Sequence, residues 1–131
     1  MNEIEQHDKI FLCGHGNPNG LLGHGGYVID SSFGEILKYK VAMCIWCHAI
    51  YFCLEHRIQG LCTGMVVSEE SEARVYNLPT DQDLIDESNE MFANAVRKHL
   101  FKPNSAKLIK KDYQSETNPI IQFNRNNIFY R

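Results

Sequence analysis

Two residues in the 131-residue sequence have the types and spacing for nucleophilic chemistry. His15 follows the apolar run 9–13, and Cys47 ends the apolar run 40–47. A thiolate is a strong nucleophile, and a neighbouring imidazole can act as its base. If the two runs are adjacent strands, the sequence predicts a catalytic pair of His15 and Cys47.

Gly16, directly after the histidine, adds a third group to this pair. Because it has no side chain, its backbone N–H can closely approach an oxyanion that develops during attack on a carbonyl. Cys47 in turn precedes a predicted helix, whose first N–H groups carry partial positive charge and favour the thiolate. We therefore expect Gly16 to stabilise an oxyanion and Cys47 to be the reactive thiol.

The elements that must position these groups are read from apolar runs. Run 9–13 predicts a short buried strand, and run 40–47, apolar without alternation, predicts a strand covered on both faces, as in a parallel sheet. Run 48–57 suits a helix closed by Gly60, and run 61–67 predicts a third strand. Right-handed crossovers would lay the three strands parallel. The prediction is an α/β fold with a small, mainly parallel sheet flanked by helices.

The other segments are compatible with one α/β domain spanning residues 1–131. Run 27–30 predicts a short strand, after which Ser31 or Ser32 can cap a short helix. Apolar residues at helical spacing predict an amphipathic helix over 80–102. The last 28 residues fit either a docking strand or a short helix.

Polar residues follow the predicted strands at the edge where ligands bind in open parallel sheets, beyond the carboxyl ends of the strands. Residues 68–69 have an alternative interpretation as a solvated loop leading into a helix, which is the one that the run of carboxylates favours. The residues that we expect to contact a substrate or ligand at this edge are Asn17, Asn19, His48, Ser68 and Glu69.

A family resemblance follows from the order of these motifs. A strand closing on His15-Gly16, a glycine-containing hairpin with the aspartate of run 27–30, and a strand closing on Cys47-His48-Ala49 resemble the caspase-like cysteine peptidases, which include metacaspase, clostripain-like and gingipain-like enzymes. The resemblance covers about residues 9–70. It implies that Cys47 is the nucleophile, that His15 is the acid and base, and that the N–H groups of Gly16 and Cys47 form the oxyanion hole.

The chain also departs from the pattern of that family. Only eight residues precede the first predicted strand, where caspase-like domains have two strands and two helices. Ile45 and Trp46 stand before Cys47 in place of the usual acidic residue, and Ile50 replaces a glycine after it. The resemblance therefore implies a trimmed caspase-like core without the usual N-terminal strands, and a cysteine hydrolase acting on an amide or peptide substrate.

Three other interpretations of the same residues remain. Cys44-x-x-Cys47-His48 has the form of a haem attachment motif, but within a strand the two thiols would point to opposite faces, which argues against haem. Zinc has many candidate His and Cys ligands, of which only Cys53 and His56 have a shared-face spacing on a helix. The turn 17–20 could also hold a small polar, nucleotide-derived ligand without any reaction, as in defence or anti-defence signalling.

Composition and charge restrict the partners. The formal net charge of −3 gives no general reason to expect nucleic acid, and no apolar segment is long enough to span a membrane. The N-terminal residues do not have the pattern of a signal peptide, so we expect a cytoplasmic protein whose five cysteines are reduced. We expect no cofactor and no metal. A small sheet exposes an edge, so we also expect a homo-oligomer.

Overall fold

The computed structural model describes residues 2–131 and divides into two compact units. The first unit consists of the residues up to Met65 together with Phe129–Arg131, and the second consists of Val66–Ile128. The prediction of a single domain over 1–131 stays a prediction, because compactness within each unit does not test it.

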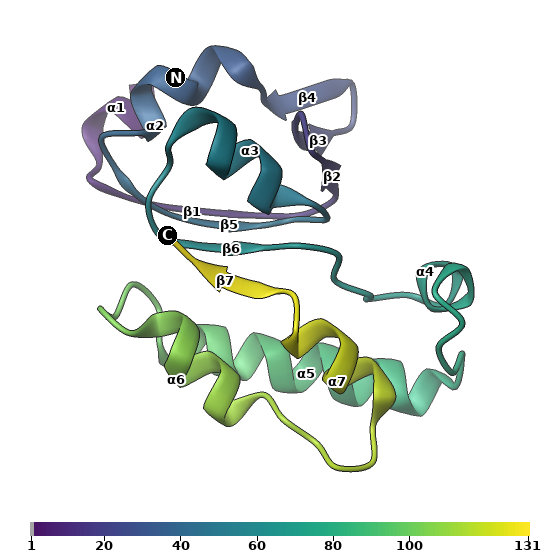
Figure 1. The fold of residues 1–131 in the computed structure, drawn as a ribbon. Coiled ribbons are helices and arrows are strands. Elements are labelled where there is room, and N and C mark those ends of the chain that lie inside the picture. Colours follow the sequence, from purple (N-terminus) through teal and green to yellow (C-terminus); the bar gives the residue numbers. More distant parts are fainter. Residues whose placement is uncertain (1) are drawn as a thin grey trace. The chain divides into compact units, whose positions relative to one another are not determined.

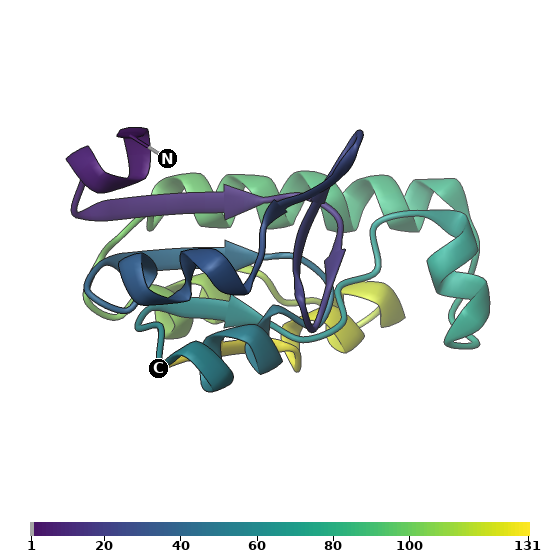
Figure 2. The same ribbon diagram turned by 90° about the horizontal axis from the view of Figure 1, so that it is seen from above.

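The first unit is built on a four-stranded sheet in the order β1-β5-β6-β7 (Figure 1). β1 and β5 are parallel and in register from Lys9 opposite Val41 to Cys13 opposite Ile45. β5 and β6 are also parallel, so the three arrows point the same way (Figure 2). The predicted α/β class and mainly parallel sheet are therefore confirmed. The strands are β1 (Lys9–Cys13), β5 (Val41–Ile45), β6 (Leu61–Thr63) and β7 (Ile128–Tyr130).

β7 makes the sheet mixed. Gly60 and Arg131, which flank β6 and β7, exchange both of their backbone hydrogen bonds, with N···O distances of 3.1 and 3.0 Å. This reciprocal exchange is the mark of an antiparallel pair. The Arg131 guanidinium also donates to the Cys53 carbonyl at 2.8 Å, which attaches Phe129–Arg131 to the rest of the first unit.

Burial along the strands corrects one expectation. β5 is buried from Ala42 to Ile45, as expected for a strand covered on both faces. β1, however, is an edge strand, and only Ile10 of its five residues is buried. Phe11 keeps 44% of its surface exposed. The apolar run 9–13 predicted a strand correctly but could not distinguish an edge position from a central one.

A small antiparallel sheet and three helical segments complete the first unit. The sheet has the order β2-β3-β4 and follows β1 in the chain. Helices α2 and α3 lie on one face of the larger sheet (Figure 1). The elements are α1 (Asn2–Gln6), β2 (Gly16–Asn17), β3 (Gly20–Gly23), β4 (Gly26–Ile29), a 3₁₀ turn (Ser31–Phe33) leading into α2 (Gly34–Leu37), and α3 (Ala49–His56).

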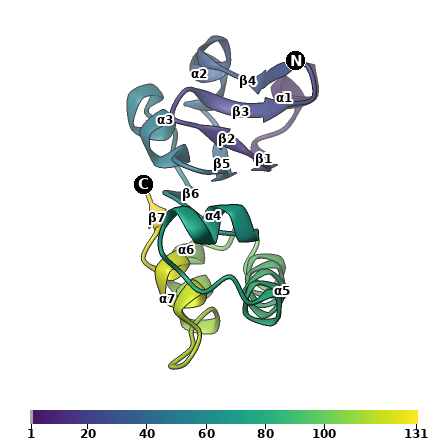
Figure 3. The same ribbon diagram turned by 90° about the vertical axis from the view of Figure 1, so that its right-hand side faces the viewer.

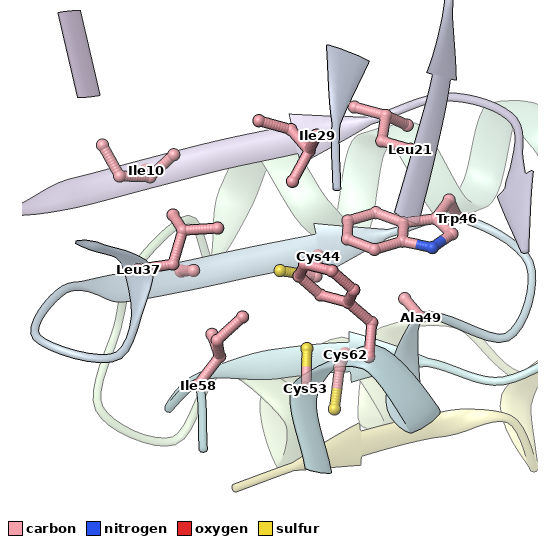
Figure 4. Close-up of a cluster of buried hydrophobic side chains, with 12 residues drawn as sticks. Ile10, Leu21, Ile29, Leu37, Cys44, Trp46, Ala49, Cys53, Ile58 and Cys62 are labelled. Atoms are coloured by element: carbon pink, nitrogen blue, oxygen red, sulfur yellow. The ribbon is translucent and has the colours of Figure 1, made fainter. Parts of the chain in front are cut away.

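Apolar side chains from these elements form the core of the first unit (Figure 4). Ala42 and Cys44 of β5 alternate onto the core face, where Phe52 of α3 packs edge-to-face on Trp46 with ring centroids 5.6 Å apart. Leu37, which belongs to α2, is fully buried in the same core. The two helices therefore cover the face of the sheet on which the strand side chains alternate inward.

Two helix ends differ from the sequence prediction. Asp30, not Ser31 or Ser32, caps the 3₁₀ turn, because its carboxylate accepts the Ser32 N–H at 2.9 Å. α3 ends on Arg57 with φ 55°, a left-handed cap without glycine. Gly60, which was expected to close this helix, instead lies against the backbone of Ala42.

The second unit contains four helices among its described residues. α5 packs against α6 and α7, and the three lie side by side (Figure 3). The amphipathic helix predicted over 80–102 is confirmed but shorter, and the C-terminal segment holds two helices as well as a strand. The helices are α4 (Glu70–Val75), α5 (Gln82–Lys98), α6 (Ser105–Asp112) and α7 (Pro119–Arg125).

A buried polar network ties the second unit together. The Asn124 amide accepts the Val67 N–H at 2.7 Å and donates to the Val67 carbonyl at 2.8 Å. It also donates to the Tyr113 hydroxyl at 3.0 Å, which lies 2.6 Å from the Ser88 hydroxyl. Burial raises the pKa of Tyr113, so the phenol stays neutral and the network stays uncharged at neutral pH.

Asp112 gives the second unit a pH dependence. Its pKa is lowered, first by the hydrogen bond with the buried His99 ring at 2.6 Å and then by Lys98 at 3.6 Å. An unfolded aspartate has a pKa of about 3.9. The pair therefore stabilises the folded state above about pH 4, and this contribution is lost as the pH falls through the lower folded-state pKa. We expect the urea midpoint of the wild type to fall more steeply below about pH 4 than that of Asp112→Asn. Equal slopes for both proteins would contradict this.

Within residues 2–131, no helix combines the length and the apolar character that a membrane span requires.

Candidate active site

Cys47 lies half-buried in the sharp turn between β5 and α3. The residues on both sides of it are hydrogen-bonded to the last residue of β6 and to the residue after it. The Trp46 carbonyl accepts the Thr63 hydroxyl at 2.8 Å, and the His48 N–H donates to the Gly64 carbonyl at 3.0 Å. His48 has φ 65° and ψ 24°, a left-handed conformation that is uncommon outside glycine. The turn therefore holds Cys47 at the entrance to α3 in a defined backbone position.

The His15 loop leaves β1 at the same edge of the sheet. The Gly14 N–H donates to the Ile45 carbonyl at 3.0 Å, which extends the pairing of β1 and β5 by one residue. The His15 carbonyl accepts the Leu22 N–H of β3 at 2.8 Å, and its side chain is exposed. Because Cys13 pairs with Ile45, His15 and Cys47 each stand two residues beyond a register pair. The structure thus brings the two predicted segments together at the carboxyl ends of β1 and β5, at matched positions of these neighbouring parallel strands.

Trp46 joins the two segments directly. Its indole N–H donates to the Asn17 carbonyl at 3.0 Å, and its ring packs on Gly16, where an added Cβ would lie 2.3 Å from the indole Cδ1. Trp46 is 1% exposed and therefore belongs to the core. The predicted role of Gly16 as an oxyanion donor stays a prediction, and packing against Trp46 is an independent reason for glycine at this position.

The asparagines of the loop have different surroundings. The Asn17 side chain accepts the Asn19 N–H at 2.8 Å and donates to the Tyr27 hydroxyl at 3.0 Å. It therefore builds the turn predicted for 17–20 and ties β2 to β4. Asn19 is exposed. His48, half-buried, has its ring 6.0 Å from the ring of Tyr51. Contact of these residues with a substrate or ligand stays a prediction.

Ser68 and Glu69 belong to the second unit, at the start of α4. The Ser68 N–H and hydroxyl both donate to the Glu72 carboxylate, at 2.9 and 3.1 Å. The Glu69 carboxylate accepts the Ser71 hydroxyl at 3.1 Å. The interpretation of this segment as a polar loop leading into a helix is confirmed, whereas a ligand-binding role for these residues stays a prediction.

The five thiols have contrasting environments. Cys44, Cys53 and Cys62 are at most 1% exposed, and their sulfur atoms lie within the core (Figure 4). The neighbouring thiols and burial raise the pKa of Cys53 and of Cys62, so both stay protonated. Cys13 is exposed as a residue, yet partial desolvation raises the pKa of its thiol as well. Cys44, buried in the core, is not accessible for the haem attachment considered above.

In residues 2–131, no group of three or more His, Cys, Asp or Glu side chains is arranged to hold a metal ion. Of the pair with helical spacing, Cys53 and His56, the cysteine is buried in the core.

A further group of ionisable residues, not expected from the sequence, lies in the second unit. A groove of about 610 Å³ runs along α5, and four carboxylates at helical spacing line it together with Lys98 and Asp112. His99, behind Asp112, is buried, and among the described residues no hydrogen-bond partner faces its Nδ1. Spacing was the available signal, since the four carboxylates occupy one helix face: Asp83, Asp86, Glu87 and Glu90.

Comparison of the chain with protein-family models, with curated proteins and with solved structures found no match.

Proposed function

We propose that this protein is a cysteine hydrolase of caspase-like type, with Cys47 as nucleophile and His15 as its base. One observation carries the proposal. The two residues stand at matched positions beyond neighbouring parallel strands, and the backbone around each is fixed by hydrogen bonds. Strand ends of this kind are where α/β folds place their active sites, and fixed backbones provide the pre-organisation that catalysis requires.

The proposed reaction is hydrolysis of an amide or peptide. His15 takes the Cys47 proton, and the thiolate attacks the carbonyl carbon while the N–H groups of Gly16 and Cys47 stabilise the oxyanion. The imidazolium returns the proton to the leaving amine, which departs as the C–N bond breaks. Water, deprotonated by His15, then attacks the thioester and releases a carboxylic acid and the thiol. The His48 N–H takes no part, because it donates to Gly64.

Binding groups for the substrate come from the same edge. Asn19 is exposed within the turn 17–20, and His48 is half-buried directly after the nucleophile. Asn17 contributes by shaping the turn. Ser68 and Glu69 are proposed separately, as ligand-binding residues of the second unit. A second copy of the chain is proposed to cover β1, since this strand lies at the sheet edge with Phe11 exposed.

A non-catalytic binding protein for a small polar, nucleotide-derived ligand is the second candidate. The observation that favours it is the contact between Gly16 and Trp46, because it explains the glycine without any oxyanion. In that case a ligand would raise the thermal stability of the wild type, and Cys47→Ala would retain the same rise.

Thiol reactivity tests the hydrolase proposal. With iodoacetamide at pH 7, we expect Cys47 to react roughly tenfold faster than Cys13, because a base and a helix N-terminus increase its thiolate fraction. The three core thiols should react last. Peptide mass spectrometry over a time course gives the rate at each cysteine.

The histidines provide matched controls for this experiment. His15→Ala should slow Cys47 to about the rate of Cys13, whereas His24→Ala removes another exposed histidine of the same glycine-rich segment and should change nothing. His48→Ala tests whether the histidine beside the thiol is the base instead. If Cys47 reacts no faster than Cys13, or is unaffected by His15→Ala, the assignment of this pair is wrong.

A further inference from the structure

Trp46 is a junction between three segments that meet beside Cys47. Its carbonyl accepts hydrogen bonds from the Thr63 hydroxyl at 2.8 Å and from the Ala49 N–H at 3.1 Å. Its indole N–H donates to the Asn17 carbonyl at 3.0 Å. The residue directly before the proposed nucleophile therefore contacts α3, the end of β6 and the loop that carries His15.

The hydrogen bond to Asn17 differs from the other attachments of this loop. Gly14 is bound to the end of β5, and His15 is bound through its carbonyl to β3, so these two bonds hold the strands together. The indole, by contrast, reaches the loop two residues after His15 from the residue next to Cys47. Its ring also fills the space that a side chain at position 16 would need, which fixes the loop against it from a second direction.

We propose that Trp46 is a positioning residue, whose indole N–H holds the His15 loop in place relative to the Cys47 thiol. The inference rests on the proposed hydrolase function, because it assigns a role in the reaction between these two residues. Trp46 itself is 1% exposed and so acts through the loop without touching a substrate. Displacing one reacting group by about 1 Å can reduce a rate by as much as a hundredfold, so a single hydrogen bond at this place has a kinetic effect.

Trp46→Phe removes the N–H donor and keeps an aromatic ring in the core. We expect the alkylation rate of Cys47 at pH 7 to fall about tenfold, toward the rate in His15→Ala. We also expect the pH profile of this rate to move to higher pH, because an imidazolium held less closely favours the thiolate less. A change in stability alone would not move that profile.

Two further variants separate positioning from folding. Since phenylalanine is smaller than tryptophan, the same experiment is repeated with β-(3-benzothienyl)alanine at position 46, which keeps both rings and replaces the N–H by sulfur. Tyr39→Phe is the control, because it removes only a hydroxyl from an exposed ring just before the amino end of β5, at the opposite end of this strand from Trp46. It should leave the pH profile of Cys47 unchanged.

The outcomes distinguish this inference from the function on which it rests. A slower, pH-shifted Cys47 in the benzothienyl variant, with a wild-type circular dichroism spectrum, supports positioning by Trp46. If Cys47 is fast and dependent on His15 in the wild type but retains its rate and profile in that variant, the inference is overturned and the hydrolase proposal stands. If Cys47 is slow in the wild type and indifferent to His15→Ala, both are overturned.

Discussion

Replacing Gly60 by alanine should lower the free energy of unfolding by about 4 kcal/mol, the sum of a strained backbone and a steric conflict. Gly60 has φ +128°, which residues with a side chain rarely adopt, and an added Cβ would lie 1.8 Å from the Ala42 carbonyl oxygen. That oxygen belongs to the backbone of the central strand β5, so it cannot move aside as a flexible side chain would. Urea unfolding followed by circular dichroism measures the change.

Two other glycines separate the contributions to this loss. Gly26 has φ +134° with no atom near its added Cβ, so Gly26→Ala should cost about 1 to 2 kcal/mol from backbone strain alone. Gly25 has open space and no such conformation, and Gly25→Ala should change stability by less than about 0.5 kcal/mol. If Gly60→Ala is no more destabilising than Gly26→Ala, the close approach to Ala42 is not a constraint on the fold.

Asn124→Ala should destabilise the protein by about 3 kcal/mol, because it leaves both backbone groups of the buried Val67 without their partners. It also removes the donor to Tyr113, which is fully buried. Loss of a buried hydrogen-bond network costs more than loss of one exposed bond, since water cannot replace the missing partners. Chemical denaturation of the purified variant gives the value.

The matched control for this prediction is two residues further along the chain. Asn126 is the same residue type but is exposed at the end of α7, so Asn126→Ala should change stability by less than about 0.5 kcal/mol. Comparable effects of the two substitutions would show that the network around Val67 contributes little.

Much of the first unit could be predicted because its signals are local. Apolar runs marked β1, β5 and β6, and the glycine and asparagine pattern after β1 marked a turn. The matched placement of His15 and Cys47 was predicted from the parallel arrangement of their two strands alone. The pairing of Cys13 with Ile45 supports it. The packing of Trp46 on Gly16 could not be predicted, because a contact across 30 residues of sequence depends on how the hairpin folds back on the sheet.

The failures have equally specific reasons. Gly60 was assigned to a helix end, since glycine commonly ends helices, but its conformation serves the approach to β5 and Arg57 ends the helix instead. The C-terminal segment was ambiguous because run 120–123 is too short for a period to be counted. Asn118 and Pro119 were the better signal there, as the Asn118 side chain caps α7 and proline occupies its first turn.

The antiparallel strand β7 makes the second unit an insertion within the first. Val66–Ile128 intervenes between β6 and the residues that pair with it, so this pairing closes a loop of 63 residues. For a flexible chain of that length the entropic cost of closure is about 4 kcal/mol. Once Val66–Ile128 has folded, its two ends are no longer free to separate and most of this cost is already met. The chain's connectivity therefore couples the stability of the two units. A substitution that unfolds Val66–Ile128 should also weaken the pairing of β7 with β6.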